Sequence, residues 1–136
     1  MMASVALLGS QIAYAHHPFP VPSTMTGTVE VEKGQRFNCD LTVTFDSNGY
    51  AYITLSPGDP RCSLLTVTPN PVPYSYNATT HEVTLNDVHA TTVTLGNCVG
   101  DIIAEWDGDT EELLIDAVLP EEVPTTGDCT IVGIIS

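Results

Sequence analysis

The sequence has almost no positive charge. Only three of its 136 residues are basic, namely Lys33, Arg36 and Arg61, against 17 acids, and the formal net charge is −14. Twelve of those acids follow Cys62. Nucleic acids and anionic membrane surfaces are bound through basic patches, so we exclude both as partners. Contacts between copies of so acidic a chain would have to be apolar, made by the backbone, or screened by salt or calcium.

Motifs of enzyme chemistry are missing as well. The sequence contains no Gly-rich phosphate loop, no nucleophile elbow and no Cys–His pairing. Two carboxylates could serve a glycosidase, but the acids here are close in sequence and fall on predicted turns. We predict that the protein is not an enzyme and needs no cofactor, apart from the metal sites considered below.

Helical periodicity is absent too, and alternation of period two takes its place. Thr and Val alternate with apolar residues in short runs, and turn residues such as Ser47-Asn48-Gly49 separate the runs; this pattern is typical of half-buried antiparallel strands. It predicts strands over residues 26–32, 37–46, 50–55, 64–68, 74–76, 81–85, 88–95, 101–106, 112–118 and 128–135. The expected fold is all-β, an antiparallel β-sandwich or Greek-key barrel of about nine strands. One such domain covers residues 25–136.

Residues 1–24 have a different composition. Residues 1–15 are apolar and uncharged and end in Ala13-Tyr14-Ala15, the form of a signal-peptidase site, and a linker with three prolines follows. Two interpretations stay open: a signal-peptide remnant, which marks an exported protein, or an arm that docks in a neighbouring subunit. The residues expected to make such assembly contacts are Val5, Leu7, Leu8, Ile12, Phe19 and Val21.

Four widely spaced cysteines indicate two disulfides. Their even number in an apparently exported β-protein allows three pairings. We favour Cys39–Cys62 and Cys98–Cys129, because each bond would close a segment that contains a hairpin. Each would stabilise the fold by about 3–4 kcal/mol through the unfolded chain.

Several short motifs follow one another in a recognisable order. Asn38-Cys39 begins an alternating strand, Gly58-Asp59-Pro60-Arg61-Cys62 forms a turn, and Leu95-Gly96-Asn97-Cys98 and Asp128-Cys129-Thr130-Ile131 come later. With these motifs, residues 26–136 resemble the alkane-oxidation protein activator family, the PraB-type secreted proteins of bacteria. The resemblance implies an all-β protein of extracellular, tube-like or fibrous surface assemblies. It implies no active-site residues.

Two functions are compatible with this pattern. The first is a structural subunit of an extracellular filament, tube or sheath, whose copies bind one another through strand edges and the N-terminal arm. The alternative is a monomeric secreted module that binds carbohydrate or an apolar ligand. Its contacts would be aromatic: Tyr50, Tyr52, Tyr74, Tyr76 and Trp106. Either function places the protein outside the cell or at its surface, with extracellular matrix or polysaccharide as a further partner.

Three polar motifs suggest metal binding or modification. Asp107, Asp109 and Glu111 alternate on a turn, where they would form a calcium site or simply a solvated hairpin tip. Cleavage after Ala15 would make His16 the amino terminus, and a copper site like that of the histidine-brace oxygenases would need His81 or His89 beside it. Asn77-Ala78-Thr79 is an N-glycosylation sequon.

Overall fold

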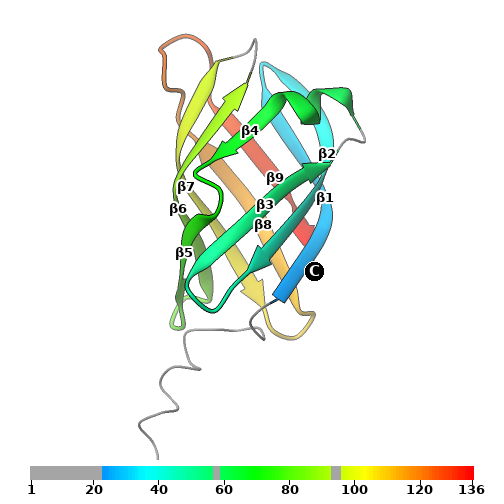
Figure 1. The fold of residues 1–136 in the computed structure, drawn as a ribbon, viewed down its shortest axis with the longest axis vertical. Helices are drawn as coiled ribbons and strands as arrows, with labels where there is room; N and C mark the ends of the chain where they lie inside the picture. Colours follow the sequence, from blue (N-terminus) through cyan, green and yellow to red (C-terminus); the bar gives the residue numbers. More distant parts are fainter. Residues whose placement is uncertain (1–22, 57–58, 93–95) are drawn as a thin grey trace, which may run out of the picture.

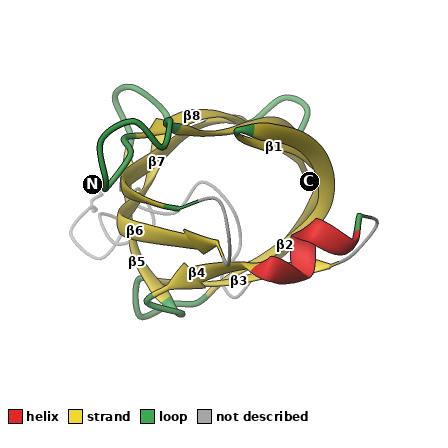
Figure 2. Cartoon of the chain, turned by 90° about the horizontal axis from the view of Figure 1, so that it is seen from above, coloured by secondary structure: helices red, strands yellow, loops and turns green. Residues whose placement is uncertain are grey.

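The computed structural model describes residues 23–56, 59–92 and 96–136, which form nine strands and one short 3₁₀ helix, η2. The strands run around a closed ring (Figure 1, Figure 2). Their bounds are β1 (Ser23–Lys33), β2 (Gln35–Phe45), β3 (Tyr50–Ser56), β4 (Leu65–Thr68), β5 (Val72–Asn77), β6 (Glu82–Thr92), β7 (Asn97–Asp107), β8 (Glu112–Leu119) and β9 (Cys129–Ile135), with η2 (Pro60–Leu64) before β4.

Eight of the strands close an antiparallel barrel. Each pairs with its neighbours in the order β6-β5-β3-β2-β1-β9-β8-β7, and β6 pairs with β7 to complete the ring. The all-β antiparallel prediction is confirmed, and of its two alternatives the structure is the barrel. Neighbours around the ring follow chain order apart from β4, because short hairpins join most of the strands. The connections are therefore those of a meander rather than of a Greek key.

Strand β2 shows why these sequences form strands. Phe37, Cys39, Leu41, Val43 and Phe45 are buried, and the residues between them face solvent, so the period of the sequence is the period of the pleat. Tight turns set its register at both ends. Gly34 takes a φ of 70° before β2 and Gly49 a φ of 89° after it, a region that favours glycine.

Strand β6 departs from the sequence prediction. Residues 81–85 and 88–95 were predicted as two strands, but β6 is one strand with a register shift between Leu85 and Val88. The Asp101 carboxylate accepts a hydrogen bond of 2.8 Å from the Asp87 N–H, and Asp87 has a φ of 55°. A contact from the neighbouring strand thus holds as a bulge what looks like a turn in the sequence.

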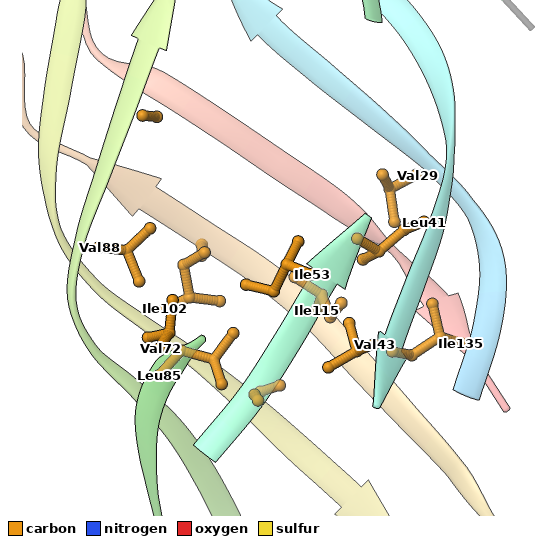
Figure 3. Packing of buried hydrophobic residues seen from close by; sticks show 14 of the residues in the cluster. Val29, Leu41, Val43, Ile53, Val72, Leu85, Val88, Ile102, Ile115 and Ile135 are labelled. Carbon is orange, nitrogen blue, oxygen red and sulfur yellow. The ribbon is translucent and has the colours of Figure 1, made fainter. Parts of the chain in front are cut away.

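The core fills the barrel with aliphatic side chains from all around the wall (Figure 3). Phe45 and Tyr74 pack edge to face with ring centroids 4.9 Å apart, and the Tyr74 hydroxyl donates to the Asp46 carbonyl at 2.9 Å. Burial, with the nearby Asp46 charge second, raises the pKa of Tyr74. The described residues therefore form a barrel that encloses its own hydrophobic core.

Both disulfides lie toward one end of this barrel. Cys39 bonds Cys62 and Cys98 bonds Cys129, which is the pairing favoured from the sequence. The first joins β2 to η2 and the second joins β7 to β9. The opposite end carries Ser23, where β1 begins two residues before the predicted domain boundary, and Ser136.

Candidate functional site

One edge of strand β6 pairs with two different strands, one after the other along its length. Its first half, Glu82–Leu85, pairs with β5, and its second half, His89–Thr92, pairs with β4. Strands β4 and β5 therefore follow one another along β6 and together occupy the position between β6 and β3. Strand β4 stands at the end of the sheet order, and Pro69 and Pro71, which follow it, lack the N–H groups that would continue a ladder.

The wall is not continuous where β4 faces β3. Strand β3 pairs with β5 only at Tyr50 and Ala51, and in the part of the chain that the structure describes β4 pairs with β6 alone. Two strand edges, Thr54–Ser56 and Leu65–Thr68, thus lie on either side of an unpaired interval, which we call the β3–β4 seam. A strand edge of this kind presents N–H and C=O groups that another strand can bind.

The side chain of Asn70 takes the place of a strand beside this seam. Its Oδ1 accepts a hydrogen bond of 3.1 Å from the Ile53 N–H, and its Nδ2 donates to the Ile53 carbonyl at 2.8 Å. Both backbone groups of Ile53 therefore point toward β4 and are satisfied by one amide. Because backbone groups alternate along a strand, those of Leu55 also point toward the seam.

An apolar cavity of 60 Å³ lies inside the barrel next to the seam. Leu55 of β3 and Leu65 and Val67 of β4 line it, and all three are only partly buried. The rest of its lining is almost wholly aliphatic, with Lys33 as its one charged residue among those described. The inward side chains on both sides of the seam therefore reach this cavity.

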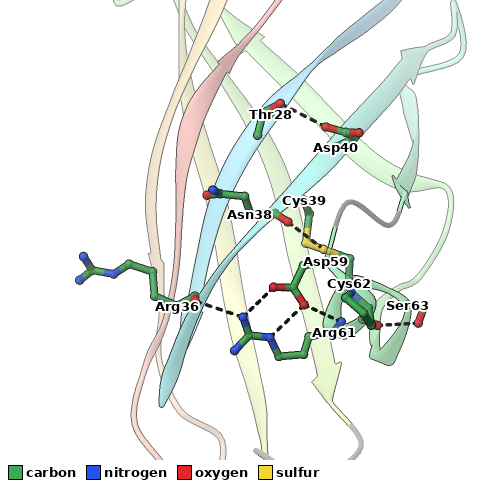
Figure 4. Close-up of a disulfide and its surroundings, with 10 residues drawn as sticks. Thr28, Arg36, Asn38, Cys39, Asp40, Asp59, Arg61, Cys62 and Ser63 are labelled. Carbon is green, nitrogen blue, oxygen red and sulfur yellow. Dashed lines mark hydrogen bonds and ion pairs between the residues drawn. A yellow bond between two sulfur atoms is a disulfide. The ribbon is translucent and has the colours of Figure 1, made fainter.

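The Cys39–Cys62 disulfide and the residues around it hold the start of β4 in place (Figure 4). The Cys39–Cys62 disulfide ties η2 to β2, and the Leu65 N–H donates to the Cys62 carbonyl. The Cys62 side chain is fully buried. The β4 edge of the seam is thus held to β2 by a covalent bond, although strand β3 lies between them in the ring.

Asp59 and Arg61 form a second set of contacts beside the disulfide. The Arg61 guanidinium donates to both Asp59 carboxylate oxygens, at 3.0 and 2.6 Å, and to Gln35 Oε1 at 2.8 Å; it also lies 4.8 Å from the Phe37 ring centroid. Hydrogen bonds from the Arg61 side chain, then from its backbone N–H, lower the pKa of Asp59 to about 2. Asp59 is ionised at neutral pH and caps η2.

A second candidate surface lies on the outside of β7, β8 and β9. Leu114 stands directly opposite Ile134 on the outer face, and both remain exposed, by 37% and 49%. Three more exposed aliphatic residues belong to the same three strands. We call the set the outer apolar patch: Ile103, Leu114, Val118, Val132 and Ile134. Seen from above, β8 lies across the barrel from β3 and β4, so the patch and the β3–β4 seam face opposite directions (Figure 2).

Carboxylates border the outer apolar patch and also interrupt it. Glu105 is opposite Leu114, while Asp116 and Glu30 stand on either side of Val132. The basic side chains are engaged elsewhere. The Arg36 guanidinium lies 3.3 Å from the Glu32 carboxylate, and the Arg61 guanidinium forms an ion pair with Asp59. The Lys33 ammonium donates to Thr126 Oγ1 at 3.1 Å and to the Gly127 carbonyl. The patch therefore combines exposed aliphatic groups with carboxylates, and one of these, Asp116, lies between Leu114 and Val118 on the outer face of β8.

The structure separates the aromatic residues predicted to bind carbohydrate. Tyr50 and Tyr52 are exposed by 43% and 47% on the outside of β3, whereas Tyr74 is buried and Tyr76 packs against the core. Trp106 packs against the core near the C-terminal end of β7. Two exposed rings on β3 remain of the predicted platform.

The polar motifs serve the turns in which they lie. The Asp107 carboxylate accepts hydrogen bonds from the N–H groups of Asp109 and Thr110, at 2.9 and 3.3 Å. Asn77 does the same for Thr79 and Thr80. The described residues include no group of three or more His, Cys, Asp or Glu that could hold a metal ion, so Asp107, Asp109 and Glu111 do not form such a cluster within one subunit.

The predicted histidine site lies partly, and the predicted arm wholly, outside the residues that the structure describes. His81 follows the β5–β6 turn, and His89 lies at the other half of β6, 3.6 Å from Asp87. His16 lies outside the described residues, as do Val5, Leu7, Leu8, Ile12, Phe19 and Val21.

Sequence reasoning missed the outer apolar patch. Its signal was a loss of alternation, since Leu113-Leu114-Ile115 and Ile131-Val132 place apolar residues on both faces of a strand.

These features define a small, acidic, disulfide-linked antiparallel β-barrel with an interrupted wall. No helix in the described ranges is long and apolar enough to cross a membrane, and the two disulfides fit an oxidising environment. The chain belongs to the alkane oxidation protein activator PraA/PraB-like family, whose model matches residues 1–136. That match confirms the family resemblance and extends it to the N-terminal residues. Neither a curated protein nor a solved structure matches the chain.

Proposed function

We propose that the protein is a secreted structural subunit of an extracellular filament, tube or sheath. The observation that carries the proposal is the outer apolar patch. Its five aliphatic side chains are exposed by 37% to 56% on three neighbouring strands. Exposed apolar side chains gathered on neighbouring strands typically mark a binding face, and a second copy of the chain covers them in the proposed assembly.

The charge distribution supports contacts of this type. Lys33 is 1% exposed, and Arg36 and Arg61 are engaged with acids of their own subunit. Copies with a net charge of −14 repel one another, so apolar and backbone contacts must provide the attraction. Salt shortens the range of that repulsion to about 10 Å at 0.1 M, and assembly is therefore expected to strengthen as salt rises.

Closure of the barrel limits the strand-edge part of the proposal. Most strands of the ring have partners on both sides, and this removes the edges that an open sandwich would offer. The β3–β4 seam is an interval of the wall in which the described parts of β3 and β4 do not pair with each other. Edge contacts between subunits are accordingly proposed there and at the N-terminal arm.

The test is the assembly state of the full chain with and without the patch. We expect sedimentation velocity and electron microscopy to show polymers that grow with concentration and salt. The double variant Leu114→Ser/Ile134→Ser should raise the concentration needed for assembly about tenfold or more. The control Tyr50→Ser/Tyr52→Ser removes two exposed rings on the opposite side and should leave assembly unchanged. A wild-type chain that stays monomeric at all concentrations and salts would refute the proposal.

The alternative of an apolar-ligand module finds less support. The interior cavity measures 60 Å³, whereas a cavity of about 150 Å³ is needed to hold a ligand as small as benzene. Tyr50 and Tyr52 are the remaining surface for carbohydrate. If the tyrosine control variant lost binding to polysaccharide while the patch variant kept it, the binding-module function would be favoured instead.

A further inference from the structure

We infer that the β3–β4 seam receives residues 5–12 of a neighbouring copy, which add there as an extended strand. The inference rests on the proposed function, because it supplies the contact that would join one subunit to the next. Three properties of the chain support it: backbone on both sides of the seam that has no strand partner there among residues 23–56, 59–92 and 96–136, an apolar cavity that Leu55, Leu65 and Val67 help to line, and the composition and length of the segment before Ser23.

The backbone on each side of the seam is suited to a further strand. Leu55 directs its N–H and C=O toward β4, since the groups of Ile53 two residues earlier point that way to reach Asn70. Strand β4 has β6 on one side only, so alternate residues of Leu65–Thr68 direct their backbone groups toward β3. An added strand would satisfy both rows, in the way that extended peptides bind to sheet edges.

The cavity is suited to the side chains of that strand. In an extended segment Val5 and Leu7 point to the same face, and this face would meet Leu55, Leu65 and Val67 in the seam. Those three lining residues are apolar and only partly buried. Two aliphatic tips would complete their burial, and removal of apolar surface from water favours such a contact.

The sequence before Ser23 indicates which part of the arm can form the added strand. Pro18, Pro20 and Pro22 lack N–H groups and cannot pair on both sides. Residues 5–12 contain no proline and no charge, and Val5, Leu7, Leu8 and Ile12 give them apolar side chains. The proline-rich residues are therefore the connection, and the segment before them is the strand.

Chain length and direction favour a neighbour over the segment's own barrel. Twenty-two residues precede Ser23, and an extended chain spans about 3.3 Å per residue, so the arm can reach well beyond the 11 residues of β1. Ser23 lies at the end of the barrel where β3 begins, whereas the seam lies toward the end where β3 finishes. The three prolines favour an extended connection, which disfavours the reversal that self-insertion requires.

Cross-linking of two separately made chains tests this contact. One full-length chain carries Leu7→Cys and the other Val67→Cys; the four native cysteines are already paired. Mixing them under oxidising conditions should give a disulfide-linked heterodimer. Thr110→Cys, at an exposed position in the turn between β7 and β8, is the matched control and should give none. An intramolecular disulfide in a dilute chain that carries both Leu7→Cys and Val67→Cys would overturn the inference in favour of self-insertion.

Blocking variants separate the inference from the proposed function. Val67→Phe should fill the seam and raise the concentration needed for assembly about tenfold, whereas Thr66→Val on the outer face should not. Leu7→Asp, which leaves the barrel sequence untouched, should have the same effect, with Ser4→Asp as its control. Polymers that persist in Leu7→Asp, or that consist of chains beginning at His16 by mass spectrometry, would overturn the inference and leave the proposed function standing. A monomeric wild type would end both.

Discussion

The side-chain amide of Asn70 pairs with the backbone of Ile53 through two hydrogen bonds, of 3.1 and 2.8 Å, as a neighbouring strand would. The amide extends the pairing of β3 by two residues, from its last contact with β5 at Ala51 to Ile53. Past Ile53 the strand faces the β3–β4 seam. One side chain thus marks the boundary between the completed wall and the part that another chain could complete.

Replacing this amide should weaken the barrel locally. Asn70→Ala removes both hydrogen bonds and leaves the two backbone groups of Ile53 without them, so we expect a loss of about 1–3 kcal/mol in the free energy of unfolding. Urea titration measures the loss, and hydrogen exchange should show a faster Ile53 amide. Thr66→Ala, on the exposed face of β4, is the control. Equal stability of the two variants would show that the amide contributes nothing.

The contact of β1 with β9 should not tolerate a larger residue at position 27. A Cβ added to Gly27 would lie 2.1 Å from the Ile134 carbonyl oxygen, and a backbone atom cannot move aside cheaply. Gly27→Ala is expected to cost about 1–3 kcal/mol or more. The matched substitution Gly108→Ala meets its nearest atom, Trp106 Nε1, at 3.5 Å. Thermal unfolding should rank Gly27→Ala well below Gly108→Ala.

The two disulfides should contribute similar stability but different local effects. They join residues 23 and 31 positions apart, and for such lengths the loop model gives about 3–4 kcal/mol each. Cys39→Ser/Cys62→Ser should also release η2 and β4, so amide protection should fall along Leu65–Thr68. Cys98→Ser/Cys129→Ser should leave those amides protected. Equal protection in both double variants would contradict the role of the first disulfide.

Acid should weaken the Asp59–Arg61 contact within a defined pH range. The pKa of Asp59 falls from 3.8 to about 2 in the folded protein. Because the folded pKa is depressed, its stabilising effect is present above about pH 4 and is lost as the pH falls toward 2. Unfolding free energies between pH 5 and pH 2 should therefore decline less steeply in Asp59→Asn than in the wild type. A parallel decline would show that the carboxylate is not responsible.

Local pattern explains what the sequence could predict. The alternation of Thr and Val with apolar residues predicted β2 and β3, because each of these strands has one face on the core. Hairpin logic also favoured the observed cysteine pairing, since Cys39 and Cys62, like Cys98 and Cys129, enclose neighbouring strands.

The remaining features depend on partners far away in the chain. The β6 bulge was taken for a turn because the carboxylate that holds it, Asp101, lies on the next strand. Lys33 reads as an ordinary surface base, but it is buried by contacts with Thr126 and Gly127, more than ninety residues later. The seam likewise arises from how β4 and β5 share β6, and no short pattern records that arrangement.

The burial of Lys33 has a consequence for proteolysis and chemical labelling. It is the only lysine, and the two arginines are Arg36 and Arg61, so the 75 residues after Arg61 contain no site for a trypsin-like protease. Within the barrel, amine-reactive fixatives meet one side chain, and it is 1% exposed. A polymer built from such subunits would resist trypsin-like proteases along those 75 residues and would take up aldehyde or ester labels mainly at the amino termini of its chains.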